Sequence, residues 1–172
     1  MPWVALFLFG HGITTFAGPH VSRALLFPME KVFEDFVTAA VRGHQRGFTV
    51  RAQGTMWHLA TDGAGKPAFR LKPDVVLSER GNVRFILNAK WKHLDPGQPN
   101  HGVSRDDAYQ LFAYGKRYGC RRVVLVHPRT TAFHRSLNFR FVNDHGLEMA
   151  CFPFNVTDSA GTIGTMVREL LR

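Results

Sequence analysis

The sequence is poor in cysteine, with Cys120 and Cys151 as its only two among 172 residues. Two cysteines without a CxxC spacing exclude a disulfide framework. They fit a reduced, cytoplasmic setting. The nine histidines show no paired ligand spacing either, so a zinc site is disfavoured.

Long apolar runs are also missing. The opening segment, residues 2–10, is apolar, but it is too short to span a bilayer and has no basic region before it. We therefore expect a buried helix there, and no membrane association. The chain contains no internal repeat and no low-complexity segment that would indicate a fibrous or disordered protein.

Acidic residues are scarce, with 13 Asp+Glu against 22 Lys+Arg, a net charge of +9 and a sequence pI of about 10.3. Hydrophobic residues make up 45% and charged residues 20%, which is typical of one globular domain of this length. The charge balance suits a polyanionic partner, most simply nucleic acid. Basicity alone is weak support, because many basic proteins never contact DNA.

Two neighbouring segments, residues 69–77 and 83–91, are typical of strands joined by a polar loop that contains Gly81. Side chains alternate faces along a strand, so one face of the second strand should carry Val83, Phe85, Leu87, Ala89 and Trp91 as core. Asn88, Lys90 and Lys92 then project from the opposite face. A hairpin would bring Asp74 beside Asn88.

This layout suits phosphodiester hydrolysis. Mg²⁺ prefers oxygen ligands, which Asp74, residue 88 and the carbonyl of Ala89 would supply. Lys90 would orient the attacking water or stabilise the charged phosphate. The same arrangement is found in metal-dependent nucleases of the PD-(D/E)xK type. The competing interpretation is an ordinary amphipathic hairpin with a solvated Lys-Trp-Lys surface.

Two flanking segments are predicted to be helices. From Met29 to Ala40 the apolar residues follow a helical stripe, and Glu34 borders it. Ser104 is a good N-cap with Asp107 in the first turn, and Gly119 ends this second helix. Its core stripe is predicted to be Ala108, Leu111, Phe112 and Gly115, while Gln110 and Tyr114 share a different face.

The remaining segments predict short strands at 48–53 and 56–60, a flexible loop at 94–102, strands at 122–127 and 147–154, and a closing helix at 162–171. This order predicts an α/β fold in which a mixed central β-sheet is flanked by helices.

Several motifs resemble the McrC family, the nuclease subunits of McrBC-type, 5-methylcytosine-dependent restriction systems. Residues 26–37 (LFPMEKVFEDFV) resemble a helix of that family, and RLKPDVVL at 70–77 and AKWK at 89–92 follow in family order. DAYQLFAYG at 107–115 and VLVHP at 124–128 match later motifs. The resemblance covers nearly the whole chain, and the combination of motifs is specific.

The resemblance implies a restriction-endonuclease-like PD-(D/E)xK core that spans residues 1–172 as a single domain, with residues 1–25 as a leading helix and loop. It implies a Mg²⁺-dependent DNA endonuclease, an McrB-like AAA+ GTPase partner, and a dimer if both strands are cut. The longer members carry an N-terminal partner-binding region that is missing here, so we expect a short relative or a fragment. The implied catalytic residues are Asp74, residue 88, Lys90 and Glu34; the metal ligands are Asp74, Asn88 and Ala89; the nucleic-acid contacts are Gln110, Tyr114, Lys92 and Arg105.

Asn88 departs from the family pattern, which has an aspartate at this position. The amide removes a full negative charge from a site that attracts Mg²⁺, so we expect weaker metal binding and slower cleavage, with DNA binding retained. Deliberate inactivation and natural degeneration would give the same residue, and the sequence does not separate them. A non-catalytic nucleic-acid-binding module and a GTPase-stimulating interaction subunit therefore remain as alternatives.

Overall fold

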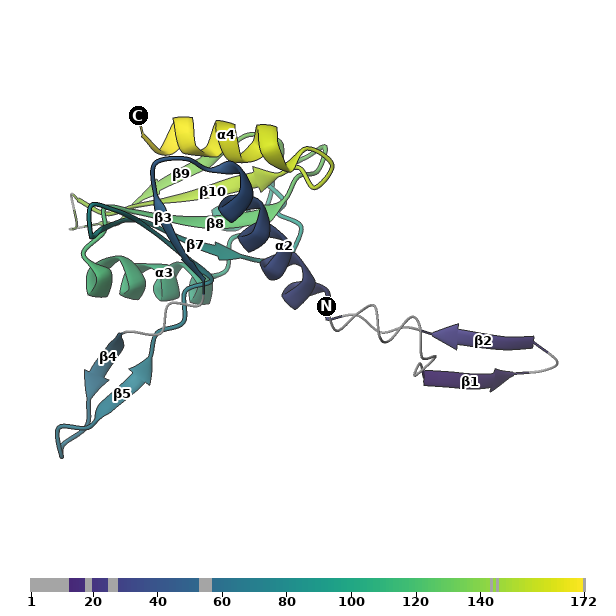
Figure 1. Cartoon of the computed structure of the whole chain (residues 1–172), viewed down its shortest axis with the longest axis horizontal. Helices are drawn as coiled ribbons and strands as arrows, with labels where there is room; N and C mark the ends of the chain where they lie inside the picture. The colour runs from purple at the N-terminus through teal and green to yellow at the C-terminus, as the bar shows by residue number, and fades with distance from the viewer. Residues whose placement is uncertain are drawn as a thin grey trace.

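The computed structural model describes residues 13–17, 20–24, 28–52, 57–142, 144 and 146–171. At its centre lies a six-stranded sheet in the order β3-β6-β7-β8-β10-β9. Helices α2 (Met29–His44) and α4 (Ser159–Leu170) cover one face and α3 (Arg105–Tyr118) covers the other (Figure 1). The strands are β3 (Thr49–Ala52), β6 (Val75–Glu79), β7 (Asn82–Ala89), β8 (Arg122–Pro128), β9 (Leu137–Arg140) and β10 (Glu148–Phe154). The predicted α/β fold with a mixed sheet is confirmed.

The middle of the sheet is parallel. β8 pairs in parallel with both β7 and β10, whereas β3–β6, β6–β7 and β9–β10 are antiparallel. In β8, residues 123–128 are all buried, as expected for a parallel strand covered on both faces. Because β7, β8 and β10 run in the same direction, their carboxyl ends meet at one edge of the sheet.

Two apolar cores hold the helices on the sheet. Phe33 and Val37 of α2 pack with Met166 of α4 over one face, and Leu111 of α3 packs over the other. The buried face of α2 differs from the predicted stripe. Phe36, which was predicted to lie in the core, is 40% exposed, whereas Thr38 and Val41 outside the predicted stripe are buried. In the predicted stripe of α3, Phe112 is half exposed and Tyr114 is buried instead.

The predicted strand at 69–77 is wrong as a single element. β5 (Pro67–Arg70) ends before residues 71–74, and β6 begins at Val75. Pro73 lacks a backbone donor for the ladder, and Phe69 has a positive φ of 56°. β5 pairs instead with β4 (His58–Thr61) in a separate two-stranded sheet that extends away from the main sheet (Figure 1).

In the second predicted strand, a β-bulge changes the face of the sheet on which the side chains before it lie. Leu77 pairs with Phe85 and Ser78 with Val83, so Arg84 is an extra residue in β7. Val83 therefore packs with the α3-side core and not with Phe85 as predicted. Both faces of this strand are buried, since Ile86 is also fully covered.

The ends of the chain differ in part from the predictions. Residues 13–17 and 20–24 form the hairpin of β1 (Ile13–Ala17) and β2 (His20–Ala24) where a loop was predicted, and the predicted helix at 2–10 lies outside the described residues. The closing helix begins at Ser159 and not at residue 162, and the predicted loop at 94–102 contains the short 3-10 helix η1 (Pro99–Gly102). None of the helices in the described part of the chain has the length and apolarity needed to cross a membrane.

Candidate functional site

A polar cleft of about 430 Å³ lies at the carboxyl end of β7. Side chains reach it from α2, from the loop before β6, from the end of β7 and from the first half of α3. Its lining residues are Glu30, Glu34, Lys72, Asp74, Asn88, Ala89, Lys90, Trp91, Lys92, Ser104, Asp107 and Gln110. The sequence prediction that the Asp74 and Asn88 segments lie together is confirmed by this geometry.

Asp74 stands immediately before β6 and is tied to β7. Its Oδ2 accepts a hydrogen bond from the backbone N–H of Ala89 at 2.8 Å. Burial raises the pKa of the Asp74 carboxyl to about 6, while the Ala89 N–H opposes the rise and the neighbouring charge of Glu34 adds to it. A carboxylate that burial disfavours gains from a nearby cation.

Asn88 is buried, with only 3% of its surface exposed. Its Nδ2 donates to Gln110 Oε1 at 3.5 Å, whereas its Oδ1 has no hydrogen-bond partner among the described residues. A buried acceptor without a partner carries an uncompensated desolvation cost. Oδ1 is therefore an oxygen that is suited to receive a cation.

Gln110 and Tyr114 form a network behind the cleft. Gln110 Nε2 donates to the Tyr114 hydroxyl at 3.0 Å, and the backbone N–H of Lys72 donates to the same hydroxyl at 3.4 Å. Tyr114 is only 3% exposed, so its hydroxyl joins α3 to the segment that carries Asp74. The geometry gives Tyr114 an ordering role, and its contact with nucleic acid stays a prediction.

Lys90 forms an ion pair that the sequence did not indicate. Its Nζ lies 3.0 Å from Asp107 Oδ1. Burial alone would raise the pKa of Asp107, but hydrogen bonds from Lys90 and with Ser104 hold it below its usual value. Ser104 Oγ accepts from the Asp107 N–H at 3.1 Å and caps α3 as predicted. The capping motif thus also places the partner of Lys90, a tertiary contact that local spacing does not reveal.

His127 is a second polar residue that the sequence analysis did not single out. It is 1% exposed, and its Nδ1 lies 3.0 Å from the Lys92 carbonyl. A carbonyl oxygen only accepts, so Nδ1 carries the proton. Burial lowers the pKa of His127, which keeps the ring neutral and fixes the chain just after Lys90.

The other predicted site residues differ in their placement. Glu34 lines the cleft and lies 3.0 Å from Lys31 Nζ, and Lys92 lines it from an exposed position with its Nζ 3.4 Å from the Gly102 carbonyl. Arg105, the first residue of α3, is exposed and is not among the lining residues of the cleft.

The oxygen atoms of the cleft fit a Mg²⁺ ion with a reduced ligand charge. Within the described ranges, no three His, Cys, Asp or Glu side chains are grouped to hold a metal. Asp74 and Asn88 Oδ1 nevertheless offer two side-chain oxygens, to which the Ala89 carbonyl adds a third. Mg²⁺ commonly needs only one or two carboxylates and completes its shell with water and phosphate.

The fold and cleft define an α/β protein with a mixed sheet and a polar site at the end of a parallel strand. The chain belongs to the family described as McrBC 5-methylcytosine restriction system component, whose profile matches residues 1–128. This confirms the family inferred from the sequence motifs.

The fold is also similar to a solved structure, described as a refined half-complex from a tetradecameric assembly of Thermococcus gammatolerans McrB AAA+ hexamers with bound McrC. The match has a TM-score of 0.65 and 16% sequence identity, and it covers 86% of this chain but 34% of the other. This chain therefore spans about a third of that relative, and the likeness concerns the fold. Among curated protein sequences, none matches the chain.

Proposed function

We propose that this chain is a Mg²⁺-dependent deoxyribonuclease domain of the PD-(D/E)xK type within an McrBC-like restriction system, weakened by Asn88. The observation that carries the proposal is the cleft itself. It brings Asp74, the unpartnered Oδ1 of Asn88 and the ammonium of Lys90 to the end of one strand. This combination of oxygen donors and a cation suits a phosphodiester.

Each residue has a role that follows from its position. Asp74 and Asn88 would hold Mg²⁺ with the Ala89 carbonyl, and the ion would supply charge stabilisation at the phosphate. Lys90, fixed by Asp107, would orient the attacking water or stabilise the phosphoryl oxygens. Gln110 and Tyr114 would order the Asp74 segment, and Glu34 would assist from α2.

Asn88 reduces the charge of the proposed metal site. The amide keeps the shape and one oxygen of an aspartate but lacks its negative charge, so Mg²⁺ should bind less tightly. Loss of one catalytic group commonly costs on the order of 10²–10⁴-fold in rate. We therefore propose that this form binds DNA and cuts it slowly.

The test is the Asn88→Asp variant in a plasmid-cleavage assay with Mg²⁺, with and without a co-encoded AAA+ GTPase. We expect cleavage to increase by at least about 10²-fold. Adding Lys90→Ala to this variant should abolish cleavage while leaving DNA affinity nearly unchanged. Absence of cleavage by Asn88→Asp, even with the GTPase present, would overturn the enzyme proposal.

A second candidate is a non-catalytic DNA-binding module. It is favoured by the hydrogen bond that Asn88 Nδ2 donates to Gln110, because the amide is accommodated in the site. If the chain is such a module, Asn88→Asp should bind DNA as the parent chain does and should not cleave it.

A third candidate is a GTPase-stimulating subunit. If the chain has this function, it should stimulate GTP hydrolysis by its partner whatever residue occupies position 88. An AAA+ GTPase gene beside this one would support the partner, and cutting of both strands would require two such sites, as in a dimer.

A further inference from the structure

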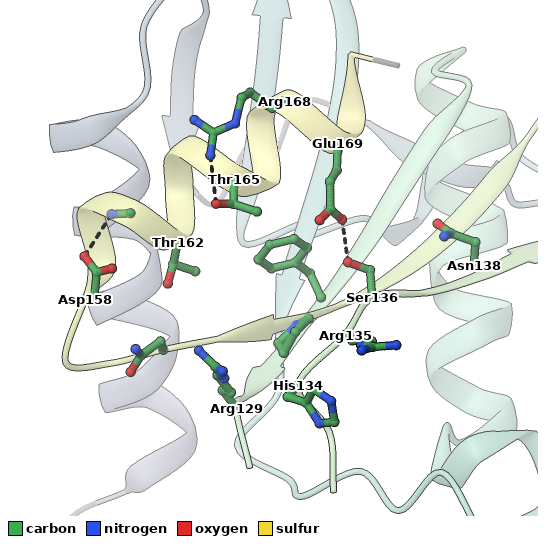
Figure 2. A pocket seen from close by; sticks show the side chains of 14 residues that line it. Arg129, His134, Arg135, Ser136, Asn138, Asp158, Thr162, Thr165, Arg168 and Glu169 are labelled. Carbon is green, nitrogen blue, oxygen red and sulfur yellow. Dashed lines mark hydrogen bonds between the residues drawn. The ribbon is translucent and has the colours of Figure 1, made fainter. Parts of the chain in front are cut away.

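A second hollow, of about 630 Å³, opens beneath α4 on the outer part of the sheet. Figure 2 shows that it lies between α4 and the segment that leads from β8 to β9, with Arg129, His134 and Arg135 gathered on the side opposite Arg168. It shares no lining residue with the cleft at Asp74. A smaller hollow shares Arg129, His134 and Asn155 with it, so the polar surface continues past the β8 end.

The hollow contains more basic than acidic side chains, with three arginines against Asp158 and Glu169. The two carboxylates bind neutral donors and not the arginines: Asp158 accepts from the Gly161 N–H at 3.0 Å, and Glu169 accepts from the Ser136 hydroxyl at 2.5 Å (Figure 2). In the part of the chain that the structure describes, Arg129 and Arg135 form no ion pair with a carboxylate. Arginine presents several donors in a fork that matches phosphate oxygens.

The hollow begins at the same sheet edge as the cleft. The Lys90 N–H donates to the Val126 carbonyl at 2.9 Å, and the Arg129 N–H donates to the Phe154 carbonyl at 2.8 Å. The end of β7 at Ala89 is therefore level with Val126, and β8 and β10 continue together for two more residues to Pro128 and Phe154. Neighbouring strands lie about 4.8 Å apart, so β10 lies only about 10 Å from β7.

A duplex carries one phosphate per about 1.7 Å of its axis. A duplex whose axis runs from β7 towards β10 would therefore reach this second hollow within a few base pairs of the cleft. Phosphate contacts away from the reacting group fix the position and register of a duplex on a protein. The polar side chains around the arginines, among them Asn138, Thr162 and Thr165, supply further groups of the kind that contact phosphates.

We propose that Arg129 and Arg135 form a second binding site for the phosphodiester backbone of the duplex whose scissile phosphate lies in the cleft. This inference rests on the proposed function, because it assumes the same DNA substrate. The site holds the duplex beside the cleft and does not take part in the chemistry.

The experiment compares two double variants of the full chain with equal loss of charge. The test variant is Arg129→Gln and Arg135→Gln. The matched control is Arg80→Gln and Arg121→Gln, whose positions lie just before the starts of β7 and β8, at the opposite edge of the sheet. Fluorescence anisotropy measures the affinity of each protein for a labelled 20-base-pair duplex across a salt series, and thermal unfolding verifies that each variant is folded.

The test variant should bind about 10²-fold more weakly at 0.1 M salt, and the slope of log affinity against log salt should fall by roughly 2. The control should stay within a few-fold of the parent chain. A folded test variant that binds like the control would overturn the second site while leaving the proposed nuclease intact. A parent chain that binds no duplex at low salt would overturn both proposals.

Discussion

Replacing Asp74 with asparagine should remove a pH-dependent loss of folding stability. Burial raises the pKa of Asp74 from 3.8 to about 6, so the folded chain keeps a proton on this carboxyl that the unfolded chain has already released. Stability from this group is therefore fully present below pH 4 and is lost as the pH rises towards 6. At 1.36 kcal/mol per pH unit, the loss above pH 6 is at most about 3 kcal/mol.

The asparagine side chain would keep the shape of the aspartate and an oxygen that accepts from the Ala89 N–H. In metal-free buffer at pH 7.5, we expect Asp74→Asn to be more stable than the parent chain by up to about 3 kcal/mol. At pH 4 the two chains should be nearly equal. Urea unfolding at half-unit pH intervals, with EDTA present, measures the difference between them.

Asp107→Asn is a control variant for which we expect the opposite change in folding stability at neutral pH. The pKa of Asp107 is held below its usual value, so its carboxylate adds stability above that range and the contribution is lost as the pH falls. Asp107→Asn should thus be less stable than the parent at pH 7.5 and close to it near pH 3. Parallel stability curves for the parent and Asp74→Asn between pH 4 and 7.5 would refute the reasoning about Asp74.

Two substitutions in α3 test the packing behind the cleft. Tyr114→Phe removes the hydroxyl that accepts from the Lys72 N–H and from Gln110 Nε2, so we expect a loss of about 1–3 kcal/mol in urea unfolding; an unchanged unfolding midpoint would contradict this network. Gly115→Ala would place a Cβ 2.6 Å from a Leu147 methyl group, and overpacking of about 1–3 kcal/mol should outweigh a helix-propensity gain of about 1 kcal/mol. Adding Leu147→Val should recover part of the lost Tm, and a Gly115→Ala variant as stable as the parent would show that the contact relaxes freely.

Sequence patterns located the parts of the fold that depend on local chemistry. Ser104 and Gly119 mark the ends of α3 because capping depends only on adjacent backbone groups, and both assignments hold in the structure. The placement of Asp74 beside β7 also followed, because a polar loop with Gly81 joins β6 and β7 as a hairpin. Buried strands such as β8 were visible from their continuous apolar run.

Features that depend on tertiary contacts were not visible in the sequence. The bulge at Arg84 reverses the face of Val83, and no local residue type marks that shift. The ion pair between Lys90 and Asp107 joins two elements, so it depends on how α3 docks on the sheet. The hollow beneath α4 likewise collects arginines from separate segments, including Arg129 and Arg168, that show no common motif in the chain.

The charges of the cleft indicate how an amide at position 88 would affect both the proposed metal binding and folding. Lys90 is paired with Asp107 and Lys31 with Glu34, whereas burial raises the pKa of Asp74, so Asp74 gains more from an added cation than either paired carboxylate. An aspartate at position 88, where the residue is 3% exposed, would put a buried carboxylate beside the partly buried Asp74. In the absence of metal the two groups would titrate as a coupled pair and lower the stability of the fold. Bound Mg²⁺ would offset that cost, because a ligand that binds only the folded state stabilises it. If the proposed Mg²⁺ site is correct, Asn88 lowers its metal affinity and lets the cleft fold without the ion, and Asn88→Asp should depend more strongly on Mg²⁺ for its Tm than the parent chain.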